Sequence, residues 1–444
     1  MQAFDHHSTD FAAGWREQYR EIRQTCPVLR AGGHGGFVLL TRYEDIKHVL
    51  LAPKDFASGR DLEIEGVPGT VAGGVTVPTN PFRMGMMEMD PPESLRLRRI
   101  LVPWFSAKAV EANAVHIRDM VTWCLDRVIE SGRCDIVDDL ANPVPALVTL
   151  DLMGLPLENW ERYARVLHGA VYREKGSAKE LAWLQGDLRA IVEERMISPS
   201  VVTTPLDALL AAEVDGTPLS TDLVVELVYM LLSGGIDTST ALIAHSVRYL
   251  SAHPRVAGEL RASPELIAGA VDEMLRFYSP GTGIARTAVH DTTLGGVAIS
   301  AGERLFMGTG AANTDPAEFD DPGTLDVRRE AGRHLAFGAG IHRCLGSFLA
   351  PREMAILLTE VLTRLPDLRV DEAGVRPYEA IPLVGGFKAM PATFTPGPKA
   401  GRFATHGLPP ARGERDRVRA AQAAGEEGKE ASAGPGSTVP YLTR

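Results

Sequence analysis

Apolar residues recur at helical spacing through most of residues 91–250, and this pattern constrains the fold more than any other feature. Turn signals such as Ser131-Gly132 and Ser198-Pro199-Ser200 separate the helical segments. A further helix is predicted to start at Ser263-Pro264, where serine can cap and proline can occupy the first turn, and to run to about Tyr278. The body of the protein is therefore predicted to be helical.

Short strands accompany these helices. Residues 37–40 are strand-like, residues 284–307 read as strand, turn, strand, and a last strand-like piece lies at residues 392–394. A strong helix is predicted to follow Cys344 and to run to about Leu365. The predicted fold class is thus α+β, mainly α with small β-sheets.

Two segments lack these patterns. Residues 61–89 are rich in glycine and methionine and predict a long loop, which in a compact domain is usually a binding loop or disordered. Beyond Pro398 the composition shifts to Gly, Ala, Glu, Arg and Pro, which cannot easily offset the entropy of ordering. We predict one large domain over residues 1–397 and a disordered tail over residues 398–444.

Composition and charge exclude several classes. The 444 residues are 45% hydrophobic and 23% charged, which is typical of a soluble globular protein. A net charge of −11 argues against nucleic acid or an anionic membrane as partner. Residues 1–26 lack the apolar run of a signal peptide, and no stretch approaches ~20 uninterrupted apolar residues. We expect a cytoplasmic protein.

The segment FGAGIHRCLG, residues 337–346, packs three glycines around one cysteine just before a predicted helix. Unpaired N–H groups at a helix start lower the pKa of a thiol and favour the thiolate. The bare backbone of the glycines lets a flat cofactor approach, and such a thiolate suits haem iron as an axial ligand. Cys26, Cys124 and Cys134 are interpreted as small buried hydrophobic residues, because their spacing fits neither a disulfide framework nor a zinc site.

This segment resembles the cysteine-ligand motif of the cytochrome P450 superfamily. The resemblance implies that Cys344 is the proximal ligand of haem b, that Phe337 packs near it and that His342 bonds a haem propionate. The alternative for His342 is a surface histidine in a loop. The glycines expected at the cofactor are Gly338, Gly340 and Gly346.

A second motif lies inside a long helix predicted from about Thr221 to Leu250. Two adjacent glycines, Gly234 and Gly235, cost about 1 kcal/mol each in a helix interior. One explanation is a loop between two helices. The other is that haem and dioxygen press against the glycines while Thr238 bonds back to the Gly234 carbonyl. The run resembles the oxygen-activation motif of the family, which implies cofactor contacts for both glycines and a catalytic proton relay by Asp237 and Thr238.

Further positions match the family. Glu273 and Arg276, an i,i+3 pair that on the surface would contribute only ~0.3 kcal/mol, resemble its Glu-x-x-Arg pair and are expected to support the cysteine loop. Arg98 and Arg286 resemble its propionate-binding arginines, the alternative being solvent-facing side chains.

Three positions depart from the family. Ser94 stands where histidine is usual, so one propionate contact is expected to be lost or taken over by water. Thr324 replaces an arginine that joins the Glu-x-x-Arg pair, and Arg328 or Arg329 is the candidate substitute. Pro351 is expected about two turns into the helix after Cys344, where it would remove a hydrogen bond and kink the helix.

The resemblance also implies partners. The substrate pocket is expected at Thr282, Gly283, Ile284 and Phe387, and its apolar lining predicts a hydrophobic small molecule. No segment is left over for a flavin domain, so electrons are expected from a ferredoxin and its NAD(P)H-dependent reductase. The candidate docking patch is basic and consists of Arg98, Arg333, Arg343 and Arg352.

The sequence is therefore interpreted as a haem-thiolate monooxygenase of secondary metabolism that inserts one oxygen atom of O2 by hydroxylation or epoxidation. A peroxide-using peroxygenase and an oxidative coupling catalyst are alternatives on the same fold. A binding module that has lost its chemistry is the alternative of a different class.

Overall fold

The computed structural model describes residues 4–199 and 203–401, so the predicted tail lies outside the described residues from residue 402 onward. The α-helices are α1 Thr9–Thr25, α2 Tyr43–Leu51, α3 Glu93–Leu101, α4 Ala107–Ala112, α5 Ala114–Asp126, α6 Pro143–Met153, α7 Trp160–Val171, α8 Ser177–Ile197, α9 Pro205–Leu210, α10 Thr221–Ala252, α11 Pro254–Ala262, α12 Ile267–Tyr278, α13 Thr309–Asn313 and α14 Leu349–Arg364. The strands are β1 Val28–Ala31, β2 Phe37–Leu40, β3 Phe56–Ala57, β4 Arg60–Glu63, β5 Thr70–Gly73, β6 Arg133–Asp135, β7 Glu213–Val214, β8 Thr217–Pro218, β9 Ile284–Ala288, β10 Thr292–Leu294, β11 Val297–Ile299, β12 Arg304–Met307, β13 Arg369–Val370, β14 Arg376–Pro377, β15 Phe387–Ala389 and β16 Pro391–Thr393.

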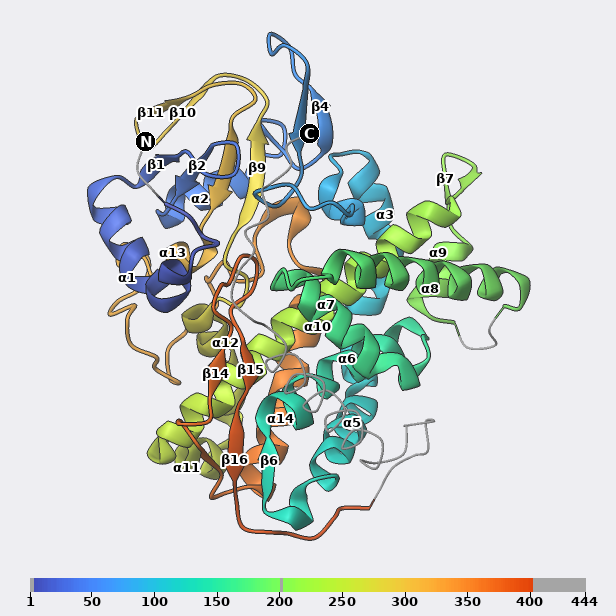
Figure 1. Ribbon diagram of the computed structural model, residues 1–444, viewed down its shortest axis with the longest axis vertical. Helices are drawn as coiled ribbons and strands as arrows, with labels where there is room; N and C mark the ends of the chain where they lie inside the picture. Colours follow the sequence, from blue (N-terminus) through green and yellow to red (C-terminus); the bar gives the residue numbers. More distant parts are fainter. Residues whose placement is uncertain (1–3, 200–202, 402–444) are drawn as a thin grey trace, which may run out of the picture. The chain divides into compact units, whose positions relative to one another are not determined.

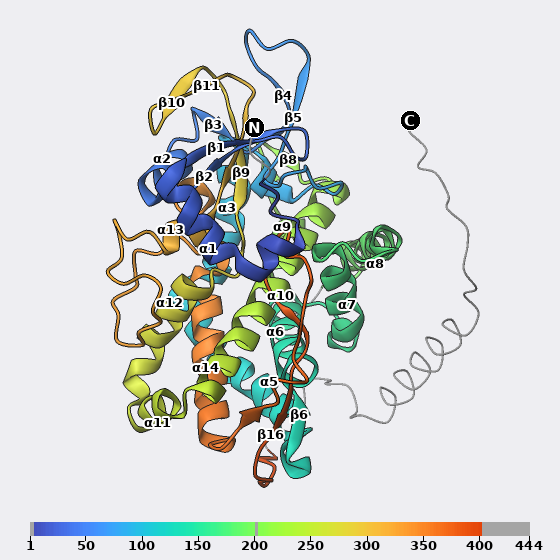
Figure 2. The ribbon, with the colours of Figure 1, turned by 60° about the vertical axis from the view of Figure 1, so that its left-hand side comes forward.

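The longest helix, α10, passes through the helical body and packs against α6, α8 and α14 (Figures 1 and 2). Its start is capped by Ser220, whose Oγ accepts a hydrogen bond from the Leu223 amide. The helix is long and apolar enough to cross a membrane, but 78% of its most apolar window is buried inside the protein. It is therefore the core helix of the fold, and the alternative of two helices joined by a loop is wrong.

A five-stranded sheet in the order β1-β2-β12-β9-β3 lies beside α1 and α2 (Figure 2). All its pairs are antiparallel except β12 with β2, which are parallel. Alternate residues of β2 face opposite sides, as strand geometry requires. Val38 and Leu40 belong to the core that contains α2, whereas Phe37 and Leu39 belong to the core that contains α1. The sheet is thus covered on both faces, and the prediction of a mainly helical fold with small sheets is confirmed.

Two local expectations were wrong. Residues 61–89 are not one loop, because β4 and β5 pair as an antiparallel hairpin and Gly85–Glu88 forms a 3₁₀ turn. The helix expected to follow Cys344 is α14, which starts at Leu349 after the short 3₁₀ helix Leu345–Ser347. Pro351 is therefore the third residue of α14, where no backbone N–H has a partner within the helix, and the predicted kink does not arise.

Candidate active site

The loop that carries Cys344 folds back on itself. The Cys344 amide donates a hydrogen bond to the Phe337 carbonyl at 2.9 Å. Gly338 and Gly340 have φ angles of 64° and 70°, in the left-handed region that favours glycine. A Cβ on Gly340 would also lie 2.5 Å from the carbonyl oxygen of Leu50, at the end of α2. Both glycines are therefore required by the shape of the loop.

Cys344 differs from the other cysteines in its surroundings. Cys124 and Cys134 are buried and Cys26 is half-buried, whereas Cys344 is accessible although protein atoms surround its thiol on most sides. Burial raises the pKa of the Cys344 thiol, while the Gly346 amide, Arg98 and Arg343 oppose this shift. The expectation of a pKa lowered by a helix start was wrong, because Cys344 precedes only one 3₁₀ turn.

The cysteine loop is tied to α12 through a buried ion pair. Arg276 bonds both carboxylate oxygens of Glu273 at 2.6 and 2.7 Å, and both side chains are fully buried. The same guanidinium bonds the carbonyl of Asn313, whose own side chain accepts from the Leu335 amide at 2.6 Å. Leu335 lies two residues before Phe337, so the network reaches the cysteine loop.

The structure shows which residue takes the place of the arginine that Thr324 replaces. The Thr324 carbonyl, not its side chain, accepts a hydrogen bond from Arg276 at 3.1 Å. Arg329 supplies the second guanidinium, with its Nε 3.2 Å from Glu273. Arg328 pairs with Glu259 instead. Of the two candidate substitutes, Arg329 therefore joins the buried pair.

Positive and hydrogen-bonding groups gather beside Cys344. Arg98 donates to the Arg343 carbonyl, and Arg286 is 3% exposed. Burial lowers the pKa of His342 to about 3, and the nearby Arg286 and Arg98 lower it further. Within residues 4–199 and 203–401, neither Arg98 nor Arg286 has a carboxylate within 4.0 Å, and the buried His342 Nε2 and Ser94 Oγ have no hydrogen-bond partner.

These groups fit the haem that the resemblance implies. The accessible Cys344 thiol lies near Arg98, and His342 lies near both Arg98 and Arg286, neither of which has a carboxylate partner among the described residues. His342 Nε2 and Ser94 Oγ have no hydrogen-bond partner there. Buried polar groups normally have hydrogen-bond partners, so buried polar atoms without partners in one region indicate that an anionic or polar ligand binds there. The two propionates of haem have that chemistry. Ser94, which replaces a histidine, lies one helical turn before Arg98 on the same face of α3.

On α10, Thr238 and the two glycines have separate surroundings. The Thr238 hydroxyl donates to the Gly234 carbonyl at 2.8 Å, as predicted. Gly234 is exposed in the middle of a buried helix, and nothing lies within 4 Å of a Cβ placed on it. A Cβ on Gly235 would lie 2.6 Å from the Thr149 hydroxyl of α6. Gly234 thus faces open space, whereas Gly235 allows the close packing of α10 on α6.

Asp237 has a partner that the sequence did not indicate. Its Oδ1 is hydrogen-bonded to Nδ1 of His168 on α7. Asp237 is 1% exposed and His168 is 9% exposed. His168 Nε2 and Asp237 Oδ2 have no hydrogen-bond partner among the described residues. The carboxylate expected to relay protons is therefore held by a buried imidazole.

The expected substrate-pocket residues make mainly structural contacts. The Thr282 hydroxyl bonds the Pro382 and Leu383 carbonyls, and a Cβ on Gly283 would lie 2.4 Å from Phe306. Phe387 packs edge-on against His245 of α10 at 4.7 Å between ring centroids.

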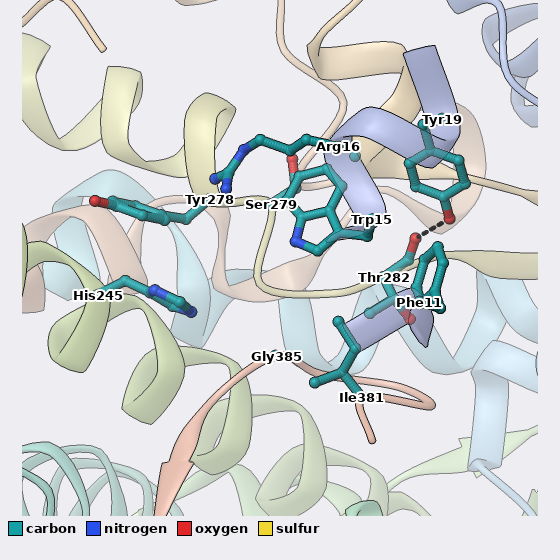
Figure 3. A pocket seen from close by; sticks show the side chains of 11 residues that line it. Phe11, Trp15, Arg16, Tyr19, His245, Tyr278, Ser279, Thr282, Ile381 and Gly385 are labelled. Carbon is teal, nitrogen blue, oxygen red and sulfur yellow. Dashed lines mark hydrogen bonds between the residues drawn. The ribbon is translucent and has the colours of Figure 1, made fainter. Parts of the chain in front are cut away.

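Thr282 also borders a small cavity (Figure 3). The cavity lies between α1, α10 and the end of α12, and the Tyr19 hydroxyl bonds the Thr282 carbonyl at 3.4 Å across it. Its volume is about 30 Å³. That is room for about one water molecule and not for an organic substrate.

Comparisons with known proteins agree with this geometry. The sequence model of the family "Cytochrome P450" matches residues 191–372. The steroid C26-monooxygenase of Mycobacterium tuberculosis strain H37Rv is 32% identical over 87% of this chain and 95% of that protein. The mycinamicin IV hydroxylase/epoxidase of Micromonospora griseorubida is 33% identical over 80% and 88%. Among solved structures, a mutant of P450 EryK in complex with erythromycin B has a TM-score of 0.78 and 27% identity, and the match covers 90% of this chain and 100% of that one.

Proposed function

We propose roles for individual residues from one premise, which is that this chain belongs to the cytochrome P450 family. It is a haem b monooxygenase that inserts one oxygen atom of O2 into a small organic substrate. Bound haem supplies the iron at which O2 is reduced. The protein's own residues bind that group, exclude water and deliver protons.

Cys344 would hold the haem iron through its sulfur in this proposal, and its setting is the observation that carries it. Of the four cysteines only Cys344 is exposed, and it lies beside Arg98 and Arg343, whose charges favour a thiolate. The Phe337 carbonyl accepts a hydrogen bond from the Cys344 amide, and the Gly346 amide donates one to the Cys344 sulfur. Gly338 and Gly340 shape the loop.

The two haem carboxylates are held by Arg98, Arg286 and His342 in this assignment. Burial lowers the pKa of Arg286 to about 10, which still leaves the guanidinium charged at neutral pH. His342 is neutral there and offers a hydrogen bond rather than a charge. Ser94 contributes its unpartnered hydroxyl. Glu273 and Arg276 support the loop without touching the cofactor.

Thr238 and Asp237 would deliver protons to the haem side of α10 in this proposal. Thr238 is partly exposed near Gly234 and can pass a proton from its hydroxyl while it accepts one from water. Asp237 is the acid that resupplies the relay, and His168 is a positioning residue that holds its carboxylate. Gly234 leaves the space in which oxygen and water fit beside α10.

The proposed substrate is a hydrophobic small molecule of secondary metabolism or a steroid. The support is the printed activity of relatives, which act on steroids and on mycinamicin IV. Thr282, Gly283, Ile284 and Phe387 remain our candidates for the pocket. Hydroxylation or epoxidation is separated from oxidative coupling by ¹⁸O₂, because coupling yields oxidised product without the label.

Electrons come from an external redox partner, and we assign this role to a ferredoxin with its NAD(P)H-dependent reductase in the cytoplasm. The exposed Arg343 supports an acidic partner, since no ion pair within 4.0 Å neutralises it among residues 4–199 and 203–401. Residues 1–397 would form the whole catalytic domain.

The test is the visible spectrum of the purified ferric protein, titrated with steroids, terpenes, fatty acids and macrolides. Wild type is expected to show a thiolate–haem Soret band that one compound shifts to shorter wavelength. Cys344→Ser is expected to lose the thiolate spectrum, and Cys26→Ser is the matched control that keeps it. A normal thiolate spectrum in Cys344→Ser would overturn the ligand assignment, and absence of haem from the wild type would favour a binding module.

A further inference from the structure

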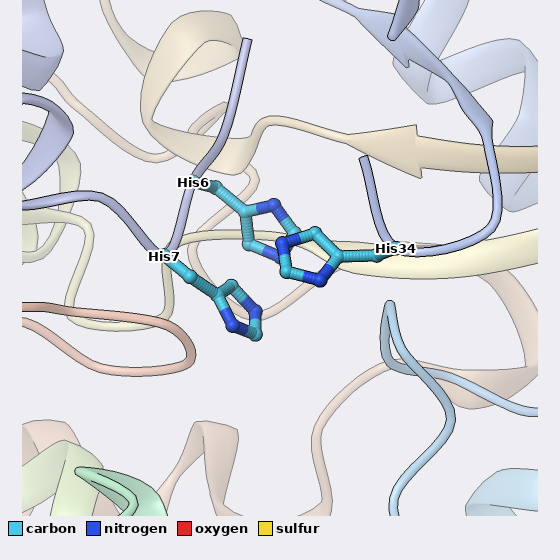
Figure 4. Close-up of side chains that lie close together, drawn as sticks. All are labelled: His6, His7 and His34. Atoms are coloured by element: carbon cyan, nitrogen blue, oxygen red, sulfur yellow. The ribbon is translucent and has the colours of Figure 1, made fainter. Parts of the chain in front are cut away.

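Three histidines meet where the N-terminal arm lies against the turn between β1 and β2 (Figure 4). His6 and His7 immediately precede α1, and His34 is in the turn. One ring nitrogen from each residue lies within 4.8 Å of the others. The roles proposed above for the oxygenase reaction do not involve these three histidines.

The hydrogen bonds of the three rings are those of metal-binding imidazoles. His6 Nε2 and His7 Nε2 lie 2.9 and 3.0 Å from the Val77 carbonyl oxygen, and His34 Nε2 lies 2.8 Å from the Asp5 carboxylate. An oxygen acceptor places the proton on Nε2, which leaves a lone pair on Nδ1. Histidines that bind metals usually donate their second N–H to a carbonyl or carboxylate in this way.

One nitrogen of the cluster is also an orphan. His6 has no exposed surface, and its Nδ1 has no hydrogen-bond partner among the described residues. A buried acceptor without a partner costs free energy, so it indicates a ligand that would complete it.

Charged side chains of both signs lie near the cluster. Arg173 lies near His7 and opposes a cation, whereas the Asp5 carboxylate faces the same group and offsets part of that charge.

The turn that carries His34 otherwise consists of glycine. His34 is the one residue with a side chain in the run Gly32-Gly33-His34-Gly35-Gly36, and its φ is 53°. Glycine or asparagine would adopt this left-handed conformation at lower cost. The turn geometry therefore does not explain the histidine, whereas its contact with the cluster does.

We propose that His6, His7 and His34 bind one divalent transition-metal ion of the zinc(II) type, with water in the fourth position. Three imidazoles and one open position are a common zinc ligand set. Tetrahedral zinc holds its nitrogen ligands about 3.3 Å apart, so the arm must draw the rings slightly closer. The ion would fasten the N-terminal arm to the β1–β2 turn.

The test uses haem-loaded full-length protein without an affinity tag, stripped with a chelator and titrated with ZnCl₂ by calorimetry. Wild type is expected to bind one equivalent and to gain a higher Tm with zinc. His34→Asn keeps the left-handed turn, and His7→Gln keeps a polar side chain. Each is expected to weaken binding at least tenfold while retaining the haem spectrum. His290→Gln removes an exposed histidine outside the cluster and is the control that binds like wild type.

Equal stoichiometry and affinity in wild type, His34→Asn and His7→Gln would overturn the proposal, as would the absence of any zinc-dependent heat in wild type. The two variants alter different segments, so if one fails to fold the other decides. The measurement does not depend on turnover, and failure of the proposed oxygenase function would leave it unaffected.

Discussion

Two adjacent side chains on α10 illustrate chemistry at the scale of single residues. Thr238 is partly exposed and bonded to the Gly234 carbonyl, whereas Asp237 is buried and bonded to His168. A group that passes protons needs contact with water, and a group that supplies them needs a fixed orientation. The two environments match these two needs.

Thr238→Ala is expected to keep haem and to divert reducing equivalents to hydrogen peroxide, because the hydroxyl that passes protons is lost. Product formed per NAD(P)H should fall severalfold while peroxide rises. Thr359→Ala is the matched control, since Thr359 makes the same bond to a carbonyl four residues earlier on α14, at 2.7 Å from Ala355. Unchanged coupling in Thr238→Ala would remove Thr238 from the relay.

His168→Phe is expected to slow turnover by about tenfold, since a buried hydrogen bond is worth roughly 1–3 kcal/mol and Asp237 would lose its partner. His168→Gln retains a donor and should recover part of the rate. The measurements are coupling and the solvent deuterium isotope effect, with thermal unfolding alongside. Equal losses in both variants, with no change in isotope effect, would mean that His168 serves only packing.

Geometry explains why the contact of Thr238 could be predicted from the sequence and the contact of Asp237 could not. The bond from Thr238 to Gly234 spans one helical turn, so residue spacing alone predicts it. Asp237 and His168 lie 69 residues apart on different helices. Their contact depends on how α7 packs on α10, and no local pattern records that packing.

At the scale of elements, α14 carries a buried acid that no function uses. Glu353 is 3% exposed, and its Oε1 has no hydrogen-bond partner among the described residues. Burial raises the pKa of Glu353 from 4.5 to about 8. The folded protein thus holds a proton there that the unfolded chain releases at lower pH.

The free energy of unfolding should therefore fall as pH rises between about 4.5 and 8 and level off above that range. One proton changes this slope by at most about 1.4 kcal/mol per pH unit. Glu353→Gln is expected to flatten the slope, as measured by urea unfolding from pH 5.5 to 8.5. Glu360→Gln, on the same helix, is the control that keeps it, and an unchanged slope in Glu353→Gln would refute the assignment.

Elements with strong periodicity were predictable and weakly patterned ones were not. The spacing of apolar residues predicted α10 from Thr221 almost to its end at Ala252. The β4–β5 hairpin was missed because its first strand has no fully buried residue and its turn contains two glycines, Gly66 and Gly69. Such a hairpin is formed by backbone pairing and shows little hydrophobic alternation.

At the scale of the whole molecule, charge is unevenly distributed. The chain carries a net charge of −11, yet the surface beside Cys344 presents arginines. Arg333 pairs with Glu318 and Arg352 pairs with Glu111. Arg98 and Arg343 lack such a pair within the described ranges, and of these two only Arg343 is exposed.

Arg343→Glu is expected to slow reduction by an acidic ferredoxin by about tenfold at low salt and to reduce the dependence on ionic strength. Reduction by dithionite should stay unchanged, because that small reductant needs no docking surface. Arg255→Glu introduces the same charge on the exposed start of α11 and is the control. Equal rates for wild type and Arg343→Glu would place the docking surface elsewhere.

Every N–H group of the Arg276 guanidinium has an acceptor, and this links the stability of several segments. Its guanidinium makes five hydrogen bonds, to Glu273, Asn313, Pro322 and Thr324, and this matches its five N–H donors. Because the donors and their acceptors are buried in the folded protein, displacing any one of these partners leaves a charged donor without an acceptor. The segments that hold Glu273, Asn313, Pro322 and Thr324 therefore depend on one another for their stability.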